Sequence, residues 1–258
     1  MENLKIIKIG GNIIDNEAAL EKFLSQFSTL TGPKILVHGG GKLATKLAHD
    51  MDVPVNMVDG RRVTDATTLD IITMVYAGKI NKNVVAKLQA YNCNAIGFTG
   101  ADGNTILAVK RPVKKVDYGF VGDVKKVNTK LINVLLENDV IPVFCAITHD
   151  KNGQLLNTNA DTIASELAIG LSRFYKTELI YCFEKDGVLL AVDDDESVID
   201  FMDTGTYQTL KIRDTFADGM LPKLENCFHA LHEGVSKVII GNPTVISNRD
   251  QKFTTLYL

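Results

Sequence analysis

The stretch Lys34-Ile35-Leu36-Val37-His38-Gly39-Gly40-Gly41-Lys42 decides the fold class of this chain. It is a short, continuous apolar run that ends in three glycines, a pattern typical of a strand buried on both faces of a parallel sheet. The chain contains five further runs of this type: Ile6–Ile9, Ala95–Phe98, Ile141–Phe144, Leu179–Cys182 and Lys237–Ile240. Since longer amphipathic stretches separate them, the sequence predicts an α/β protein whose mainly parallel open sheet is sandwiched between helices.

The segments between the strands carry helix and hairpin signals. Three helices are predicted from their apolar stripes and first residues: Glu17–Leu30 after an Asn16 N-cap, Lys130–Glu137 after Thr129, and a helix from Asn159 onward. Two stretches instead alternate around turn residues, Val53–Val63 and Leu107–Val127. Alternation of this kind is typical of β-hairpins, so both are expected to project from the sheet.

The composition is that of an ordinary globular protein, with 45% hydrophobic and 23% charged residues in 258 positions. A net charge of −3 gives no electrostatic reason to expect nucleic-acid binding. No apolar segment approaches the ~18 residues of a membrane span, and the N-terminus does not read as a signal peptide. The four cysteines lie far apart, which argues against a disulfide framework or a zinc site. We therefore expect a soluble, cytoplasmic protein with no metal ligands of its own.

Two of the expected strands end in glycines that stand beside a lysine. Gly10-Gly11 follow Lys8-Ile9, and Gly39-Gly40-Gly41 precede Lys42. Glycines after a parallel strand let backbone N–H groups approach an anion, and a helix N-terminus adds to this preference. We interpret the two turns together as a phosphate-binding site. The P-loop pattern does not fit, because Leu36 stands where its first glycine is required.

A dinucleotide-binding fingerprint is the alternative interpretation. Gly39-x-Gly41-x-x-Ala44 has the required spacing, and Asp59 lies where the ribose-binding acid is expected, which indicates an NAD-binding oxidoreductase. Against this alternative, Asp59 precedes Gly60 in a predicted hairpin turn. The fingerprint also gives no role to Gly10-Gly11 or to Lys223.

Two further polar groups carry candidate chemistry. Asn157-Thr158-Asn159-Ala160-Asp161 opens a predicted helix, and its three amide or carboxyl groups exceed what a helix cap requires. Lys223 follows Asp218-Gly219 in a loop that leads into a late helix. Two lysines, two glycine turns and one carboxylate suggest phosphoryl transfer, because that reaction needs charge neutralisation and alignment more than covalent chemistry.

The motifs extend over nearly the whole chain, in eight segments: Ile7–Gly11, Val37–Gly41, Gly60–Thr64, Gly78–Lys82, Gly119–Gly122, Gly153-Gln154, Asn157–Asp161 and Gly219–Lys223. Together they resemble the amino-acid kinase family, and within it the acylglutamate branch. The resemblance implies a two-lobed amino-acid kinase fold. It also implies ATP-dependent phosphorylation of the side-chain carboxylate of an N-acylated glutamate, in arginine synthesis.

The resemblance implies catalytic roles for three residues. Lys8 would hold the phosphoryl group in flight, Lys223 would hold the ATP phosphates, and Asp161 would orient both lysines. The phosphoryl and substrate oxygens would be cradled by the backbone N–H groups of four glycines: Gly10, Gly11, Gly40 and Gly41.

The two substrates would bind to different residues. Arg62 would grip the substrate α-carboxylate with help from Asn157, with Asn159 behind them, and the Val53–Val63 hairpin would be the lid. The residues expected to contact ATP are Gly10, Gly11, Asp186, Gly187, Val188, Phe216, Ala217 and Asp218. The chain departs from the family at Phe183-Glu184, where a Ser/Thr-Asp pair is usual.

The resemblance further implies an N-terminal lobe, 1–172, that binds the acylated amino acid and forms the dimer. The C-terminal lobe, 173–258, would bind ATP, and Mg²⁺ would arrive with the nucleotide. The first strand is expected to begin at Lys5 or Ile6. The residues before it are too few for the extra N-terminal helix of the hexameric, arginine-inhibited members, so we expect a homodimer that is insensitive to arginine.

Arg61 is a second departure, a cation where the family motif generally has an apolar residue. Pointing inward, Arg61 could pair with a carboxylate-bearing acyl group such as succinyl. Neighbouring strand positions face opposite sides, however, so we expect Arg61 to point away from the site and the acyl group to be acetyl.

Overall fold

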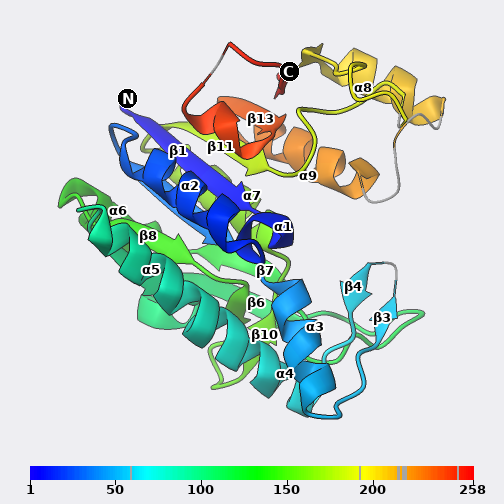
Figure 1. Cartoon of the computed structure of the whole chain (residues 1–258). Helices are drawn as coiled ribbons and strands as arrows, with labels where there is room; N and C mark the ends of the chain where they lie inside the picture. Colours follow the sequence, from blue (N-terminus) through cyan, green and yellow to red (C-terminus); the bar gives the residue numbers. More distant parts are fainter. Residues whose placement is uncertain (59, 192, 214–215, 217–219, 249) are drawn as a thin grey trace.

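The computed structural model describes residues 1–58, 60–191, 193–213, 216, 220–248 and 250–258. Its centre is an eight-stranded sheet with the order β12-β14-β13-β11-β1-β2-β8-β5, in which every neighbouring pair is parallel except β13 and β14. The predicted α/β class is confirmed (Figure 1). The bounds of these strands are β1 Asn3–Ile9, β2 Lys34–His38, β5 Ala95–Phe98, β8 Ile141–Phe144, β11 Lys176–Cys182, β12 Phe201–Met202, β13 Lys237–Gly241 and β14 Thr254–Leu256.

All six predicted apolar runs are strands of this sheet. β1 begins earlier than the predicted Lys5 or Ile6, because Asn3 and Leu4 already pair with Lys176 and Thr177 of β11. β1 and β11 thus lie at the centre of the sheet and join its two halves.

Helices cover the sheet on both faces, with α2 and α5 on one side and α7 on the other (Figure 1). Asn16 and Asn159 cap α2 and α7 as predicted. The expected start of α6 is wrong by one residue, since Asn128 is the N-cap and Thr129 the first helical residue. The bounds are α1 Gly11–Ile14, α2 Glu17–Ser28, α3 Gly41–Asp50, α4 Ala66–Thr73, α5 Asn81–Ala90, α6 Thr129–Glu137, α7 Ala160–Leu171, α8 Thr204–Ile212 and α9 Met220–His232.

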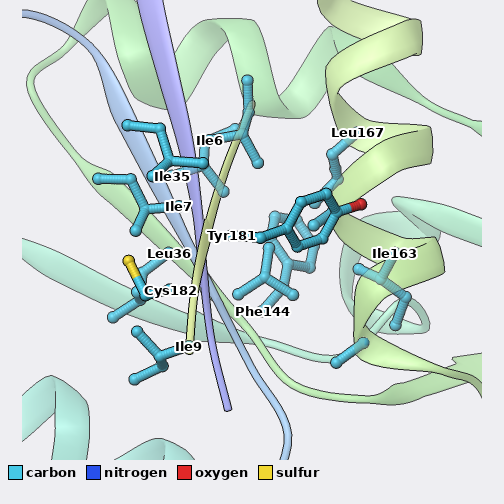
Figure 2. Packing of buried hydrophobic residues seen from close by; sticks show 14 of the residues in the cluster. Ile6, Ile7, Ile9, Ile35, Leu36, Phe144, Ile163, Leu167, Tyr181 and Cys182 are labelled. Atoms are coloured by element: carbon cyan, nitrogen blue, oxygen red, sulfur yellow. The ribbon is translucent and has the colours of Figure 1, made fainter. Parts of the chain in front are cut away.

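Alternation along β1 sends side chains to opposite faces of the sheet. Figure 2 shows Ile7 and Ile9 on one face, whereas Ile6 lies with Tyr181 on the face that packs against Leu167 of α7. Because side chains alternate with a period of two, Lys8 shares the α7 face with Ile6. The core therefore places a single lysine of β1 beside the start of α7.

Two smaller sheets border the main one, and both contain a predicted hairpin. The four-stranded sheet has the order β10-β9-β6-β7, with β6 Ile106–Lys110 and β7 Gly122–Val127 antiparallel. Its other strands are β9 Ile147–His149 and β10 Leu155–Asn157. The second hairpin is the two-stranded sheet of β3 Met57–Val58 and β4 Arg61–Arg62.

A π-helix, Met74–Ile80, links α4 to α5 without a break in the chain's helical path. The sequence analysis contains no expectation for this segment. Widened turns of this type occur frequently at functional sites. Here the segment brings Tyr76 and Ile80 against Gly40, at the end of β2.

The described residues include no helix that is both long and apolar enough to cross a bilayer. The four cysteines are buried and form no disulfide, as predicted. Burial raises the pKa of the Cys145 thiol to about 12, so this group is a thiol at neutral pH rather than a nucleophilic thiolate.

Candidate active site

Lys8, Asp161 and Lys223 meet at one point, although they lie on three different elements. The Nζ atom of Lys8, near the carboxyl end of β1, lies 2.7 Å from Oδ1 of Asp161 in the first turn of α7. The Nζ atom of Lys223, on α9, lies 3.5 Å from Oδ2 of the same carboxylate. One carboxylate thus holds two ammonium groups side by side, and the cluster keeps one net positive charge.

The surroundings of Asp161 keep it ionised. Burial alone would raise the pKa of this carboxyl group, but Lys8 and Lys223 outweigh that effect and lower the pKa to about 2. Tyr181 donates a hydrogen bond of 3.0 Å to the backbone carbonyl of Asp161. Lys223 also lies above the rings of Tyr181 and Phe183, at 5.8 and 5.4 Å from their centroids. Cation–π contacts of this kind hold an ammonium group in place without neutralising it.

Both predicted glycine turns border a cavity of about 580 Å³. Its walls include Gly10 and Gly11 after β1, Gly41 and Lys42 at the start of α3, and Phe183 after β11. A Cβ atom at Gly10 would lie 3.8 Å from Nζ of Lys8, so the first turn runs directly past the charged cluster. Glycines from two strand ends thus border one space, an arrangement suited to a polyanion.

A second cavity, of about 250 Å³, lies on the other side of Gly41. Its lining includes Gly40, Arg62, Asn157 and Asn159, the residues that the sequence analysis assigned to the acylated amino acid. Gly41 borders both cavities, and Asn159 lies two residues from Asp161 in the chain. The two cavities therefore share Gly41, and their walls contain chain neighbours of the charged cluster, namely Gly10 in the first cavity and Asn159 and Ala160 in the second.

Arg62 is the most confined cation of the second cavity, with 8% of its surface exposed. Its Nη2 atom donates to the carbonyl of Gly41 at 3.0 Å and to Oγ1 of Thr45 at 2.7 Å. Its Nη1 atom is buried and has no hydrogen-bond partner among the described residues. A guanidinium on the wall of a cavity is suited to a carboxylate ligand.

The two asparagines have different structural tasks. Asn157 donates from Nδ2 to Oγ1 of Thr64 at 3.0 Å, and Thr64 donates to the carbonyl of Arg62 at 3.1 Å. Asn159 uses its Oδ1 to cap α7, accepting from the backbone N–H groups of Asp161 and Thr162. The cap holds Asp161 in place, while the amide of Asn159 remains on the cavity wall.

The residues predicted to contact ATP lie in different surroundings. Gly187, Val188 and Phe216 line a small cavity of about 90 Å³ together with Phe183. Asp186 does not border this space, and its carboxylate accepts a hydrogen bond from the side-chain amide of Asn242. Ala217 and Asp218 lie outside the described residues.

Gly187 also has a packing reason to be glycine. A Cβ atom there would lie 2.6 Å from Oγ1 of Thr254 and 2.6 Å from Cγ1 of Val198. The close approach of β14 therefore excludes a side chain at this position.

The dinucleotide-binding alternative lacks its structural context. Asp59 lies outside the described residues, but Met57 and Arg62 on either side of it pair in the antiparallel β3–β4 hairpin. The fingerprint requires this segment to be a parallel strand next to β2, and the neighbours of β2 are β1 and β8.

The expectation that Arg61 points away from the site stays a prediction. Its side chain is exposed, but Arg61 borders the same 250 Å³ cavity as Arg62.

Sequence reasoning also missed Tyr76 and Arg111, which border the same cavity. Tyr76 reaches it through the π-helix, for which the sequence carries no simple periodic signal. Arg111 follows β6 directly, where a bulge between Leu107 and Ala108 shifts the register against β7. A shift of this kind re-aims the side chains that follow it.

His38 and Asn81 form hydrogen bonds next to the Gly39–Gly41 turn. His38 is fully buried, and its Nδ1 lies 2.8 Å from the carbonyl of Gly39 while its Nε2 lies 3.0 Å from Nδ2 of Asn81. Asn81 also donates to the carbonyl of Val143 on β8. Burial lowers the pKa of His38 to about 4, so the ring is neutral at physiological pH. A neutral ring with a proton on Nδ1 satisfies both neighbours.

Comparisons with known proteins agree with this geometry. The chain is 55% identical to an acetylglutamate kinase of Cytophaga hutchinsonii, covering 93% of this chain and 91% of that relative. It is 52% identical to an acetylglutamate kinase of Bacteroides fragilis, with 93% and 92% covered. The solved structure of smu.665 from Streptococcus mutans UA159 is similar with a TM-score of 0.78, at 26% identity and 98% coverage of both chains.

A more distant structure shows the shared fold. Carbamate kinase from Giardia lamblia bound to AMP-PNP has a TM-score of 0.72 at 14% identity, with 99% of this chain and 98% of that chain covered. Residues 3–242 match the model of the Amino acid kinase family. The fold, the site and these comparisons lead to one conclusion: the chain belongs to the amino acid kinase family.

Proposed function

We propose that the protein transfers the γ-phosphoryl group of ATP to the side-chain carboxylate of N-acetyl-L-glutamate, forming N-acetyl-L-glutamyl 5-phosphate in arginine biosynthesis. One observation carries the proposal. A carboxylate holds two ammonium groups, chain neighbours of this cluster line two cavities, and these cavities share Gly41. Relatives at 55% and 52% identity bear the name acetylglutamate kinase.

In this reaction the protein has to align the two substrates and offset their negative charge. It does not have to activate the attacking group, because a carboxylate is already an anion. An oxygen of the substrate's side-chain carboxylate bonds to the γ-phosphorus as the bond to the β,γ-bridging oxygen breaks. The leaving pair of electrons stays on ADP, and no proton has to move. Lys8 and Lys223, held apart by Asp161, offset the charge on the phosphoryl oxygens during transfer.

The residues that line the second cavity bind the acylated amino acid in this proposal. In this proposal the guanidinium of Arg62 binds the α-carboxylate of the acylglutamate, and Asn157 and Asn159 line the space beside it. N–H groups of Gly40 and Gly41 face the side-chain carboxylate. Tyr76 lines the same cavity.

ATP occupies the 580 Å³ cavity in this proposal, with its phosphates at Gly10, Gly11 and Gly41 and its base toward Gly187 and Val188. Mg²⁺ arrives as the counter-ion of these phosphates. Among the described residues, no group of three or more His, Cys, Asp or Glu side chains could hold a metal ion. The phosphates would thus be the cation's main ligands.

We further propose that residues 1–172 form the acylglutamate-binding lobe and residues 173–258 the ATP-binding lobe of a cytoplasmic homodimer. The chain passes between the lobes after α7, which ends at Leu171. β5 forms one edge of the main sheet and exposes 41% of Ile96, which marks an N-terminal surface for pairing. Light scattering at micromolar concentration tests the dimer.

A thermal-shift titration tests the proposed substrates. ATP–Mg²⁺ and N-acetylglutamate should each raise the melting temperature, because a ligand at 100 times its Kd stabilises the folded state by about 2.7 kcal/mol. NAD should have no effect. Stabilisation by NAD and not by ATP–Mg²⁺ would contradict the proposal and restore the oxidoreductase alternative.

A further inference from the structure

Two aromatic rings lie beside the ammonium group of Lys223. Its Nζ atom is 5.4 Å from the centroid of the Phe183 ring and 5.8 Å from the centroid of the Tyr181 ring. Both distances are within the range of about 6 Å in which the face of a ring attracts a cation. Tyr181 belongs to β11 and Phe183 directly follows this strand, so side-chain alternation places both rings on one side. The end of β11 thus presents two neighbouring rings to one lysine of α9.

The charges around Lys223 hold it less closely than they hold Lys8. Lys223 lies in the first turn of α9, where the positive end of the helix dipole disfavours a cation. Its Nζ atom is 3.5 Å from Oδ2 of Asp161, whereas Lys8 contacts the same carboxylate at 2.7 Å. A charge-assisted hydrogen bond between nitrogen and oxygen is usually about 2.7–2.9 Å long. Asp161 therefore fixes Lys8 better than Lys223, and the two rings are the further attraction that acts on Lys223.

Phe183 is anchored through its backbone and borders open space. Its backbone N–H donates to the carbonyl of Gly241 on β13 at 3.0 Å. The residue lines the cavity of about 580 Å³ that is assigned to ATP in the proposed function. It also lines the cavity of about 90 Å³ next to Gly187. Phe183 is thus a neighbour of Lys223 and a wall residue of the nucleotide cavity at the same time.

Tyr181 has a second task that Phe183 does not share. It is fully buried, and its hydroxyl donates to the backbone carbonyl of Asp161 at 3.0 Å. Figure 2 shows its ring on the face of the sheet that packs against α7. A change at Tyr181 would therefore disturb Asp161 as well as Lys223. Phe183 is the ring whose contact with Lys223 can be tested without disturbing this hydrogen bond.

We propose that Phe183, together with Tyr181, is a positioning residue for Lys223 and holds its ammonium group toward the phosphoryl group in transfer. A cation–π contact suits this task, because a ring attracts the cation without neutralising its charge. The amino-acid kinase family usually has a Ser or Thr at this position, so this chain presents a ring where a hydroxyl is usual. The inference rests on the proposed function, since it concerns the same phosphoryl transfer.

The first experiment removes the ring and keeps an apolar side chain. Phe183→Leu should lower kcat at saturating ATP–Mg²⁺ and N-acetylglutamate by about threefold to thirtyfold, the range expected for one cation–π contact. KM for N-acetylglutamate should stay near the wild-type value, because Phe183 does not line the second cavity. Phe183→Tyr, which restores a ring, should return kcat to near the wild-type value.

Phe174→Leu is the matched control. Phe174 is an exposed phenylalanine before the opposite end of β11, and it lines neither of the two cavities that Phe183 borders. This variant should keep the wild-type kcat. A wild-type kcat with a raised KM for ATP in Phe183→Leu would show that Phe183 is only a wall of the nucleotide cavity, which overturns the proposal.

A second replacement changes the charge distribution of the ring and keeps its shape. Pentafluorophenylalanine in place of Phe183 has a ring face that no longer attracts a cation. It should lower kcat as Phe183→Leu does, while the midpoint of urea denaturation stays at the wild-type value. An unchanged kcat would refute the positioning role. This protein keeps the test decisive if Phe183→Leu fails to fold.

A double-mutant cycle assigns the effect to Lys223. Methionine carries no charge for the rings to attract, so Phe183→Leu should cause no further loss of phosphoryl transfer when it is added to Lys223→Met. Single-turnover measurements with protein in excess over ATP provide these rates. An equal factor of loss in both backgrounds would show that Phe183 acts independently of Lys223 and would contradict the proposal.

The outcomes also separate this inference from the proposed function. If the wild-type protein forms the acyl phosphate and Phe183→Leu forms it at the same rate, the positioning role is refuted and the kinase assignment stands. If the folded wild-type protein forms no acyl phosphate from N-acetylglutamate, the kinase assignment itself is refuted.

Discussion

Oδ1 of Asp161 lies 2.7 Å from Nζ of Lys8, and its Oδ2 faces Nζ of Lys223 at 3.5 Å. The three residues come from β1, α7 and α9, which are far apart in the sequence, so they meet only in the folded protein. Because the carboxylate is shared, neither lysine is neutralised by its own partner. The pair keeps the excess positive charge that a phosphoryl group in transfer requires.

Removing either lysine should abolish most of the turnover. Lys8→Met and Lys223→Met are each expected to lower kcat by about a hundredfold or more. This is the loss in kcat that typically follows the removal of one preorganised charged donor. Both proteins should keep their circular dichroism spectra. Lys46→Met, which removes an exposed lysine of α3, is the control and should retain full activity. Wild-type turnover in Lys8→Met or Lys223→Met would show that the cluster does not contact the reacting group.

Arg62→Lys should act mainly on binding of the acylated amino acid. The planar guanidinium of Arg62 can contact Gly41, Thr45 and a carboxylate at the same time, and the single ammonium group of a lysine cannot. We expect KM for N-acetylglutamate to rise by about tenfold to a hundredfold, while KM for ATP stays near the wild-type value. Steady-state kinetics with each substrate varied in turn provide both numbers. An equal rise in both KM values would contradict the separation into two cavities.

Gly40 and Gly41 should differ in their tolerance to alanine. Gly40 has φ of 154°, and a Cβ atom there would overlap Cδ1 of Ile80 and lie 3.0 Å from Cδ1 of Tyr76. Gly40→Ala is therefore expected to lower the free energy of unfolding by about 1–3 kcal/mol. A Cβ atom at Gly41 meets nothing within 4 Å, so Gly41→Ala should preserve stability. Urea denaturation of the two variants measures both free energies of unfolding. An equal decrease in the two variants would contradict the close packing of the π-helix against Gly40.

His38 should make the protein sensitive to acid. Its pKa is about 4 in the folded protein against an ordinary value of 6.5, so the unfolded chain binds the proton more tightly. The stabilisation from neutral His38 is complete above pH 6.5 and is lost as the pH falls toward 4, by about 3 kcal/mol in total. Urea denaturation between pH 7 and pH 4.5 measures this slope. His38→Gln should flatten it, and an unchanged slope in that variant would assign the acid sensitivity to other groups.

Much of the fold could be predicted because its signals are local. Six continuous apolar runs identified six strands of the main sheet, and Asn16 and Asn159 identified two helix starts. The π-helix escaped prediction, because its hydrogen-bond pattern depends on how Tyr76 and Ile80 pack against Gly40.

The candidate site was predictable where residues follow strand ends. Lys8, Gly10 and Gly41 belong to this class, since parallel strands bring their carboxyl ends to one edge. The place of Arg111 on the cavity wall could not be predicted, because it depends on the bulge in β6 and on the ion pair with Asp123 across the hairpin. Alternation of polar and apolar residues does not reveal a one-residue shift of register.

Formation of the acyl phosphate tests the central claim most directly. The protein is incubated with ATP–Mg²⁺, N-acetylglutamate and hydroxylamine, which converts an acyl phosphate into a hydroxamate. N-acetylglutamine, whose side chain ends in an amide, serves as the matched unreactive substrate, and Lys8→Met as the matched protein. The account predicts hydroxamate in equal amount to the ADP formed, with wild-type protein and N-acetylglutamate only. ADP formation without hydroxamate, or a folded protein that forms neither product, would contradict it.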